Sequence, residues 1–364
     1  MTFSSRVLSL FPTPAYLTTP AAGIDVSDHS VKFLTFSKSH THGRRVSGYG
    51  AATIPKGVVV NGRVVDALKL IEVLSRFREE HVLHFVRASL PEEEGYIFPA
   101  YVPANISDKE VRDVLEFKLA ENVPLAPAEA VFDFDVVQNT PPVGDQRLVS
   151  VSAYPQTASQ EYTDLLMSAG LEPLSLEIEA QAIARAIVPK SFMGACMVVD
   201  IGKTRSGISV VRGQSVRFTA TVAIGGDSVD DAMRMARPEM TEEEIVRIKN
   251  EEGMRFAGDA AIRGGLDTFV KNITTELDRY IVYWQTHKDS KDASAPRIPI
   301  ERVFLSGGNA NMHGLADYLS AQLHIPVEVG NVWVNAFSLE GYVPEMSFAE
   351  SLGYASAIGL ALHE

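Results

Sequence analysis

The chain has 364 residues, of which 46 are acidic and 33 are Lys or Arg, and its formal net charge is −13. This acidic balance argues against nonspecific nucleic-acid binding. The single cysteine, Cys196, excludes an internal disulfide framework. No apolar run approaches the ~18 residues of a membrane span. The length predicts about two domains, with residues 1–22 as an N-terminal arm that packs on the body.

Two segments share one pattern, in which an apolar strand ends in an aspartate, a polar turn follows, and a second strand begins. Asp25 lies in the first segment and Asp200 in the second. Facing hairpin tips of this kind hold phosphates on backbone N–H groups and hold a water-ligated Mg²⁺ near their carboxylates. We therefore expect Asp25 and Asp200 to be metal-shell residues. The other expected phosphate contacts are Ser27, Ser30, Lys32, Gly202, Lys203 and Thr204.

Each of these residues also has an ordinary structural interpretation. Aspartate favours turns without any ligand. Lys32 fits a solvated strand lysine as well as a phosphate contact.

A third element supports a nucleotide site. The apolar strand that begins at Val303 runs into Gly307, Gly308 and Asn309. Paired glycines let a ring or a sugar approach the backbone, so these residues are candidates for adenosine contact, although an ordinary strand-to-helix turn has the same pattern. Gly225 and Gly226 are weaker candidates of the same kind. Lys249 would either reach the ribose from its helix or lie on a solvated face.

Glu179 is the candidate catalytic residue. It lies on a helix predicted over residues 175–188, and a carboxylate there would orient an attacking water, since positioning dominates phosphoryl transfer. A helix-surface charge is the competing interpretation.

The hydrophobic pattern predicts strands over residues 23–54, a helix over 64–80 and a strand over 85–90. A strand-helix-strand-strand-helix unit follows, and its first helix begins at the capping box Ser107–Glu110. This unit has no phosphate-binding signal, so we interpret it as an interaction subdomain. The expected units are 23–90 (subdomain 1A, first part), 91–170 (inserted subdomain), 171–194 (bridging helix), 195–224 (2A, first part), 225–299 (2B) and 300–364 (2A, second part).

The order of the two hairpins and the Gly-Gly strand resembles the actin-like ATPase superfamily. Within it, the chain resembles the PilM family of type IV pilus assembly proteins, which are related to FtsA. The matching segments are Gly23–Lys32, Pro55–Gly62, Glu121–Leu125, Glu177–Ala186, Ile224–Asp227 and Leu305–Gly308. The resemblance implies an α/β fold with duplicated sheet-helix domains around a nucleotide cleft.

The resemblance also implies function. Members bind ATP, with Mg²⁺, and the cytoplasmic N-terminal peptide of the bitopic membrane protein PilN. A cytoplasmic scaffold at the inner face of the membrane, assembling into a ring or filament, is therefore expected. Ser27 stands where glycine is expected, followed by Asp28 and His29, and the run Lys203–Arg205 is bulky and basic. These departures predict a slow ATPase at most, and the alternatives are a sugar kinase of the same superfamily and a pseudo-ATPase adaptor.

Overall fold

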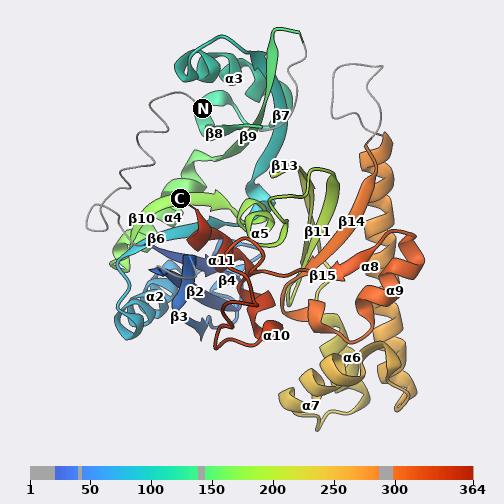
Figure 1. Cartoon of the computed structure of the whole chain (residues 1–364). Coiled ribbons are helices and arrows are strands. Elements are labelled where there is room, and N and C mark those ends of the chain that lie inside the picture. Colours follow the sequence, from blue (N-terminus) through green and yellow to red (C-terminus); the bar gives the residue numbers. More distant parts are fainter. Residues whose placement is uncertain (1–20, 40–42, 138–143, 287–297, 364) are drawn as a thin grey trace.

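The computed structural model describes residues 21–39, 43–137, 144–286 and 298–363. The expected arm therefore lies almost entirely outside the described residues. Two five-stranded sheets form the body (Figure 1). In the first sheet, β1 pairs antiparallel with β2 and parallel with β6. Its strand order is β10(Glu172–Ile178), β6(Phe85–Leu90), β1(Ala22–Val26), β2(Ser30–Ser39) and β3(Gly43–Thr53).

The second sheet repeats this arrangement. Its strand β11 pairs antiparallel with β12 and parallel with β14, as β1 does with β2 and β6. The order is β13(Ser215–Val222), β12(Ser206–Arg212), β11(Ala195–Ile201), β14(Ile300–Ser306) and β15(Val327–Val329). The duplication expected from the two aspartate hairpins is therefore present at the level of the whole sheet.

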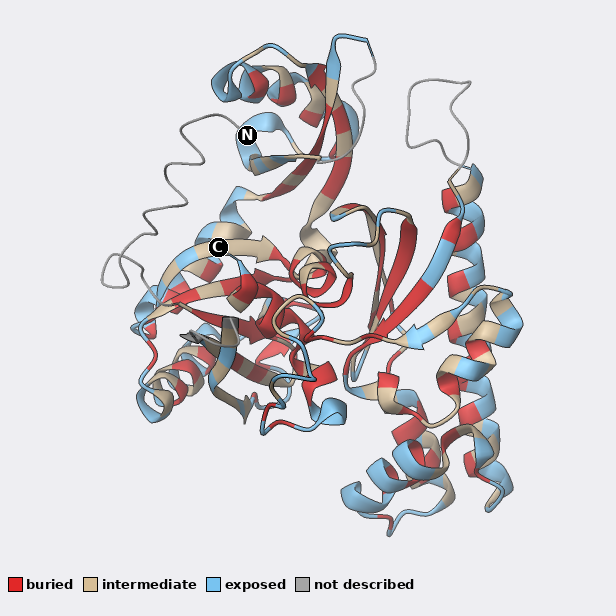
Figure 2. Cartoon of the chain, viewed as in Figure 1, coloured by how far each residue is buried: buried red, intermediate tan, exposed pale blue. Residues whose placement is uncertain are grey.

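Two short helices, α5(Glu179–Ile187) and α11(Ala355–Leu362), pack against each other between the sheets. A Cβ on Gly359 would lie 1.8 Å from the carbonyl oxygen of Ala182, so only glycine allows this contact. Buried residues are concentrated in the two sheets and in these helices (Figure 2). We call the first sheet with its covering helices α2(Ala67–His81) and α4(Gln156–Ser168) the first lobe.

The second lobe consists of the second sheet and the helices that follow β13. Its long helix α8(Ala260–Thr286) buries one face, whose apolar residues recur at helical spacing from Ile262 to Trp284. A capping box formed by Thr241 and Glu244 starts α7. The remaining helical elements are α6(Asp227–Ala236), α7(Glu242–Arg247), η4(Ile248–Glu252), η5(Gly253–Arg255), η6(Gly308–Asn311), α9(Leu315–Leu323), α10(Phe348–Ser351) and η7(Leu352–Tyr354).

A small sheet with one helix stands above the first lobe in Figure 1. It follows η2(Glu92–Glu94), and the capping box at Ser107 starts its helix as predicted. We call it the inserted subdomain: β7(Tyr96–Pro103), α3(Asp108–Asn122), η3(Pro127–Glu129), β8(Ala130–Val136) and β9(Gln146–Pro155). Its sheet order is β7-β9-β8, and it has its own core.

Three sequence expectations need correction. Residues 175–178 belong to β10, so the helix predicted over 175–188 begins only at Glu179. The helix predicted over 64–80 begins at Ala67, because Asp66 caps it, and it buries Leu70, Leu74 and Phe77. α4, predicted as part of the inserted unit, contributes Leu165 and Leu166 to the core of the first lobe. The subdomain boundaries stay predictions, and this packing favours an inserted subdomain that ends near Pro155.

One further hairpin matters for the site. β4(Val59–Val60) pairs with β5(Arg63–Val64) around Asn61 and Gly62, whose φ values are 52° and 74°. An Asn-Gly pair with positive φ is the preferred composition of a two-residue hairpin turn. No helix in the described ranges combines the length and apolar character needed to cross a membrane.

Candidate functional site

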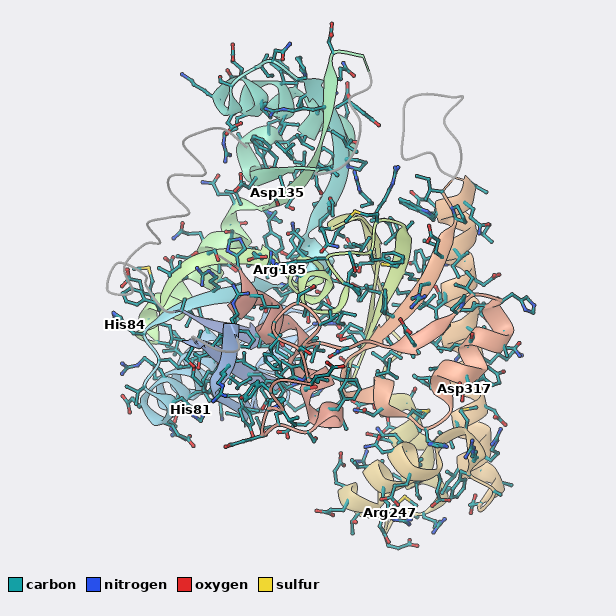
Figure 3. The ribbon with its side chains drawn as sticks, in the orientation of Figure 1. His81, His84, Asp135, Arg185, Arg247 and Asp317 are labelled. Carbon is teal, nitrogen blue, oxygen red and sulfur yellow. The ribbon has the colours of Figure 1, made fainter. Side chains whose placement is uncertain are left out.

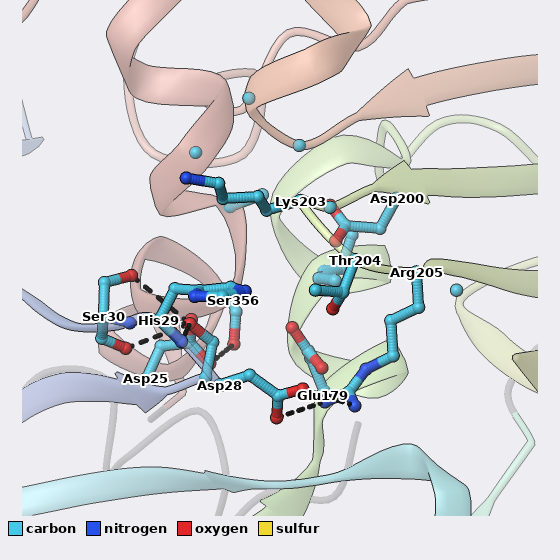
Figure 4. A pocket seen from close by; sticks show the side chains of 18 of the residues that line it. Asp25, Asp28, His29, Ser30, Glu179, Asp200, Lys203, Thr204, Arg205 and Ser356 are labelled. Carbon is cyan, nitrogen blue, oxygen red and sulfur yellow. Dashed lines mark hydrogen bonds and ion pairs between the residues drawn. The ribbon is translucent and has the colours of Figure 1, made fainter. Parts of the chain in front are cut away.

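A cavity of about 270 Å³ lies between the two lobes, where the turns of the two aspartate hairpins face each other (Figure 4). The parallel pairing of β1 with β6 and of β11 with β14 places several strand ends at this edge. Twelve of the fifteen predicted site residues line the cavity, namely Asp25, Ser27, Ser30, Lys32, Glu179, Asp200, Gly202, Lys203, Thr204, Gly307, Gly308 and Asn309. Gly225, Gly226 and Lys249 do not line it. The ligand roles of all fifteen stay predictions.

Asp25 is fixed by two hydroxyl groups, one from β6 of the first lobe and one from α11. Its Oδ1 accepts hydrogen bonds from Ser89 Oγ at 2.7 Å and from Ser356 Oγ at 3.1 Å. The carboxyl group is buried, with 8% of the residue exposed. These bonds hold the carboxylate at the cavity wall in one orientation.

The first turn tolerates serine at the position where glycine was expected. Ser27 is not among the described residues with positive φ, so this turn does not need the conformational freedom of glycine. Its backbone N–H donates to the Ser30 carbonyl oxygen at 2.9 Å, and its hydroxyl also donates there at 3.0 Å. Ser27 therefore closes the turn, and the departure from glycine does not distort it.

Lys32 lies directly across from Asp25 in the β1–β2 pairing. Its ammonium group donates to the Gly353 carbonyl oxygen at 2.6 Å and lies 5.6 Å from the centre of the Tyr354 ring. This contact connects the first sheet to the segment before α11. Lys32 is therefore held by protein contacts and is not a fully solvated strand lysine. It also lines the cavity.

The second turn is supported from behind by the two glycines that do not line the cavity. Gly226 N–H donates to the Gly202 carbonyl oxygen at 3.0 Å, and Asp227 N–H donates to the Lys203 carbonyl oxygen at 2.7 Å. A Cβ on Gly225 would lie 2.4 Å from the Lys203 carbonyl oxygen. Gly225 and Gly226 therefore permit close packing beneath the second turn. Their position behind the turn does not support a direct contact with a ligand.

The backbone at the end of β14 requires glycine at position 307. Gly307 has φ of 85°, and a Cβ there would lie 2.5 Å from the Ile201 carbonyl oxygen. Asn309 follows and donates from Nδ2 to the Gly202 carbonyl oxygen at 2.9 Å. Lys249 is buried behind it, with Nζ 2.6 Å from Asp230 Oδ1 and 2.9 Å from Asn309 Oδ1. Lys249 therefore orients Asn309 and is not on the solvated face considered above.

The carboxyl groups of the cavity shift one another's pKa values. Burial, followed by the charge of the nearby Asp25, raises the pKa of Asp200 to about 6, although the Ser306 hydroxyl and the charge of Lys32 partly oppose this rise. Burial raises the pKa of Glu179 well above its usual range, and Asp25 and Asp200 add to this effect. Glu179 is the first residue of α5 and faces the cavity. Without bound cations, the cavity therefore favours the protonated form of this glutamic acid.

Four charged lining residues were not selected from the sequence: Asp28, Glu92, Glu93 and Arg205. Burial raises the pKa of Glu92 to about 8, and a hydrogen bond with the Thr221 hydroxyl partly opposes this. The acidic run after β6 was an available signal, because ligands of open α/β sheets gather at the carboxyl ends of strands. Asp28 and Arg205 had been noted only as departures from the small-residue pattern.

The electrostatics fit a polyanion that enters with a cation. Six carboxyl groups (Asp25, Asp28, Glu92, Glu93, Glu179 and Asp200) line the cavity, against Lys32, Lys203 and Arg205. Within the described residues, no three His, Cys, Asp or Glu side chains converge in a way that could hold a metal ion by themselves. Mg²⁺ commonly keeps several waters and shares its remaining ligands between carboxylates and phosphates. Asp25 and Asp200 fit that role.

The family model described as type IV pilus assembly protein PilM matches residues 23–364. The chain belongs to the PilM family. A solved structure titled "PilM-PilN type IV pilus biogenesis complex" has a TM-score of 0.73 to this family member at 21% identity, covering 94% of this chain and 98% of the other.

Two further solved structures have the same fold. EutJ, the ethanolamine utilization protein of Carboxydothermus hydrogenoformans, has a TM-score of 0.52 at 15% identity, with 96% and 91% of the two chains covered. MreB5 of Spiroplasma citri bound to ADP has a TM-score of 0.50 at 12% identity, with 93% and 95% covered. No curated protein matches the chain significantly. The chain thus has the actin-like ATPase fold that the resemblance implied.

Proposed function

We propose that this PilM-family protein is an ATP-binding scaffold of type IV pilus assembly, which also binds the N-terminal peptide of a PilN-like membrane protein. The family match over residues 23–364 carries the proposal. The titles of the similar structures support its two parts, since one names a PilM-PilN complex and another names bound ADP.

The cavity provides a consistent place for Mg·ATP. The adenosine end would lie against Gly307, Gly308 and Asn309, and the phosphates would lie between the two turns. Bound Mg²⁺ would neutralise phosphate charge beside Asp25 and Asp200. The protein's own contribution is to hold those carboxylates and the turn N–H groups in fixed positions.

The kinase alternative needs a general base beside an acceptor. Among the carboxyl groups that line the cleft is Glu92, whose pKa burial raises to about 8, so that its protonated form is favoured at neutral pH. A protonated acid cannot accept the proton of a hydroxyl group. This observation favours nucleotide binding with a scaffold role over sugar phosphorylation.

Calorimetry with Mg·ATP tests the nucleotide site. Asp200→Ala removes one carboxylate of the expected Mg²⁺ shell, so Mg-dependent affinity should fall about 100-fold, or about 2.7 kcal/mol, while the fold is retained. Asp317→Ala is the matched control, because Asp317 is an exposed aspartate of the second lobe that does not line the cavity (Figure 3). Wild-type affinity in Asp200→Ala would refute the assignment.

The partner peptide requires a separate groove. A second cavity of about 590 Å³ lies between β8 of the inserted subdomain, α5 and the end of α11. Asp135 and Arg185, labelled in Figure 3, are on opposite sides of it. β8 is an edge strand of its sheet in the described part of the chain, and edge strands accept extended peptides through main-chain hydrogen bonds. We place the PilN-like peptide here.

Fluorescence anisotropy of a labelled peptide, taken from the N-terminus of the PilN-like protein of the same source, tests this placement. Val136→Trp would fill part of the cavity from β8 and should weaken binding at least tenfold. Val131→Trp is the matched control, since Val131 is an exposed residue of the same strand that does not line the cavity. Both variants should bind Mg·ATP like the wild type. Equal effects of the two substitutions on peptide binding would place the partner elsewhere.

Binding to such a peptide would hold the protein at the inner face of the cytoplasmic membrane without a span of its own. Assembly into a ring or filament would then present several nucleotide-bound copies to the membrane partners. Sedimentation with and without Mg·ATP and peptide measures this assembly.

A further inference from the structure

The two hairpin turns carry residues of opposite charge that meet across the cleft. Arg205 of the second turn donates from Nη1 to Asp28 Oδ2 at 3.1 Å and from Nη2 to Asp28 Oδ1 at 3.2 Å. Figure 4 shows these two side chains reaching toward each other. Asp28 follows the serine that stands in place of an expected glycine, and Arg205 ends the bulky, basic run of the second turn. Two separate departures in the sequence therefore form one bidentate ion pair.

Asp28 is firmly held on its own lobe. Its carboxylate also accepts the backbone N–H groups of Asn61 and Gly62, each at 3.0 Å. The positive φ values of that turn aim both N–H groups at the same side chain. The Gly62 carbonyl oxygen in turn accepts a hydrogen bond from the Tyr162 hydroxyl at 2.7 Å. A guanidinium bound to Asp28 is therefore bound to a rigid part of the first lobe.

Arg205 also contacts the segment that leads into the inserted subdomain. Its Nε lies 2.6 Å from Glu93 Oε1 in η2, directly before β7. Oε1 of the neighbouring Glu92 accepts a hydrogen bond from the Thr221 hydroxyl of β13 at 2.9 Å. A Cβ on Gly207 would lie 2.6 Å from Glu92 Oε1, so η2 is seated closely on the second sheet.

We propose that Arg205 is a latch across the nucleotide cleft, which joins the second turn to Asp28 and Glu93 and limits the rate of nucleotide exchange. The proposal rests on the proposed nucleotide-binding function. Separating the lobes would break a bidentate pair whose side chains are only 20% and 10% exposed. Breaking a largely buried pair is costly because each charge is left uncompensated. Through Glu93, the same residue joins the cleft to the subdomain that we expect to bind the partner.

A different role for Arg205 predicts different results. If Arg205 were mainly a phosphate ligand, its removal would weaken ATP binding, whereas neutralising Asp28 would release the guanidinium and strengthen binding. A latch predicts that both changes act in the same direction, because either one breaks the same pair. It also predicts that the two effects do not add.

The experiment measures the release rate of a fluorescent methylanthraniloyl-ATP in the presence of Mg²⁺, displaced by excess unlabelled ATP. Arg205→Gln and Asp28→Asn should each speed release about tenfold, and the double variant should also show about a tenfold increase. Arg302→Gln is the control, because Arg302 forms an exposed ion pair with Glu328 on the same sheet, away from the cavity. Its release rate should equal that of the wild type.

Opposite effects of Arg205→Gln and Asp28→Asn, fully multiplicative effects, or unchanged rates would each overturn the latch. If either variant fails to fold, Glu93→Gln breaks the less buried contact and should still speed release. Hydrogen exchange in the nucleotide-free protein provides an independent measurement. Peptides covering Glu92–Gly95 and Ser215–Val222 should exchange faster in Arg205→Gln than in Arg302→Gln.

The two proposals can fail separately. If the wild type binds no nucleotide, the proposed function is wrong, and hydrogen exchange alone then decides for or against the latch. If the wild type binds nucleotide and the exchange and release rates of Arg205→Gln remain unchanged, only the latch is wrong.

Discussion

The two aspartate hairpins have the same backbone topology and different chemistry. β1–β2 and β11–β12 occupy equivalent positions in two sheets of the same strand order. In the first, Asp25 is held by two serine hydroxyls, and the turn carries the acidic Asp28. In the second, burial raises the pKa of Asp200, and the turn carries the basic Lys203 and Arg205.

This difference shows how a duplicated fold makes a site that is not symmetric. Two identical acidic turns would repel each other across the cleft. Because one turn carries the carboxylate and the other the guanidinium, the lobes attract each other at the point where phosphates are expected. The following predictions test this contrast, from the largest expected effect to the smallest.

The first prediction compares the two aspartates directly. Asp25→Ala should lower the free energy of unfolding by about 3 kcal/mol, because it removes charge-assisted hydrogen bonds and leaves two buried hydroxyls without that partner. Asp200→Ala should lower it by less than about 1 kcal/mol, because the raised pKa of Asp200 means that its charge is destabilising in the folded state. Urea unfolding at pH 7.5 measures both. Equal losses of unfolding free energy in Asp25→Ala and Asp200→Ala would contradict the proposed difference between the two aspartates.

The second prediction concerns Glu92, which the first lobe presents to the second sheet. Its pKa rises from 4.5 in the unfolded chain to about 8 in the folded protein. The protonated form therefore contributes stability below about pH 4.5, and this contribution is lost progressively as the pH rises toward about 8.

Glu92→Gln should remove this pH-dependent loss of stability, since glutamine has nearly the same shape as glutamic acid and stays neutral at every pH. Between pH 5 and pH 8, the wild type should lose about 2 kcal/mol relative to the variant, which is about half of the full value for three pH units because Glu92 keeps some solvent contact. Thermal and urea unfolding across this range provide the measurement, with Glu328→Gln as an exposed control. Parallel pH profiles of wild type and Glu92→Gln would show that Glu92 is ionised in the folded state.

The third prediction concerns turnover. Without partners, hydrolysis should be slower than about 1 s⁻¹, the low end of typical enzymes. Burial raises the pKa of Glu179 and favours its protonated form, which glutamine imitates, so Glu179→Gln should change the rate less than about threefold. Phosphate release under saturating Mg·ATP measures this. A loss of 100-fold would show that Glu179 acts as an anion once the cation is bound.

Much of the fold could be predicted from the sequence because its signals are local. The capping boxes at Ser107 and Thr241 and the apolar face of α8 depend on residues a few positions apart, and the structure contains all three. The sequence alone also predicted the duplicated hairpins and the Gly-Gly strand end that meet at the cavity. The start of α5 could not be predicted, because the apolar residues of β10 continue into it without a Pro or Gly between them.

The tertiary structure decided which residues meet across the cleft. Asp28 and Arg205 are 177 positions apart, and each by itself reads as a departure from a small-residue turn. Their pairing depends on the relative position of two sheets, which no local pattern encodes. The raised pKa values of Glu92, Glu179 and Asp200 likewise arise from burial and from the charges of neighbouring carboxyl groups. The sequence determined the two turns, and the packing of the lobes determined their chemistry, because electrostatic interactions depend on distance and burial in the folded molecule.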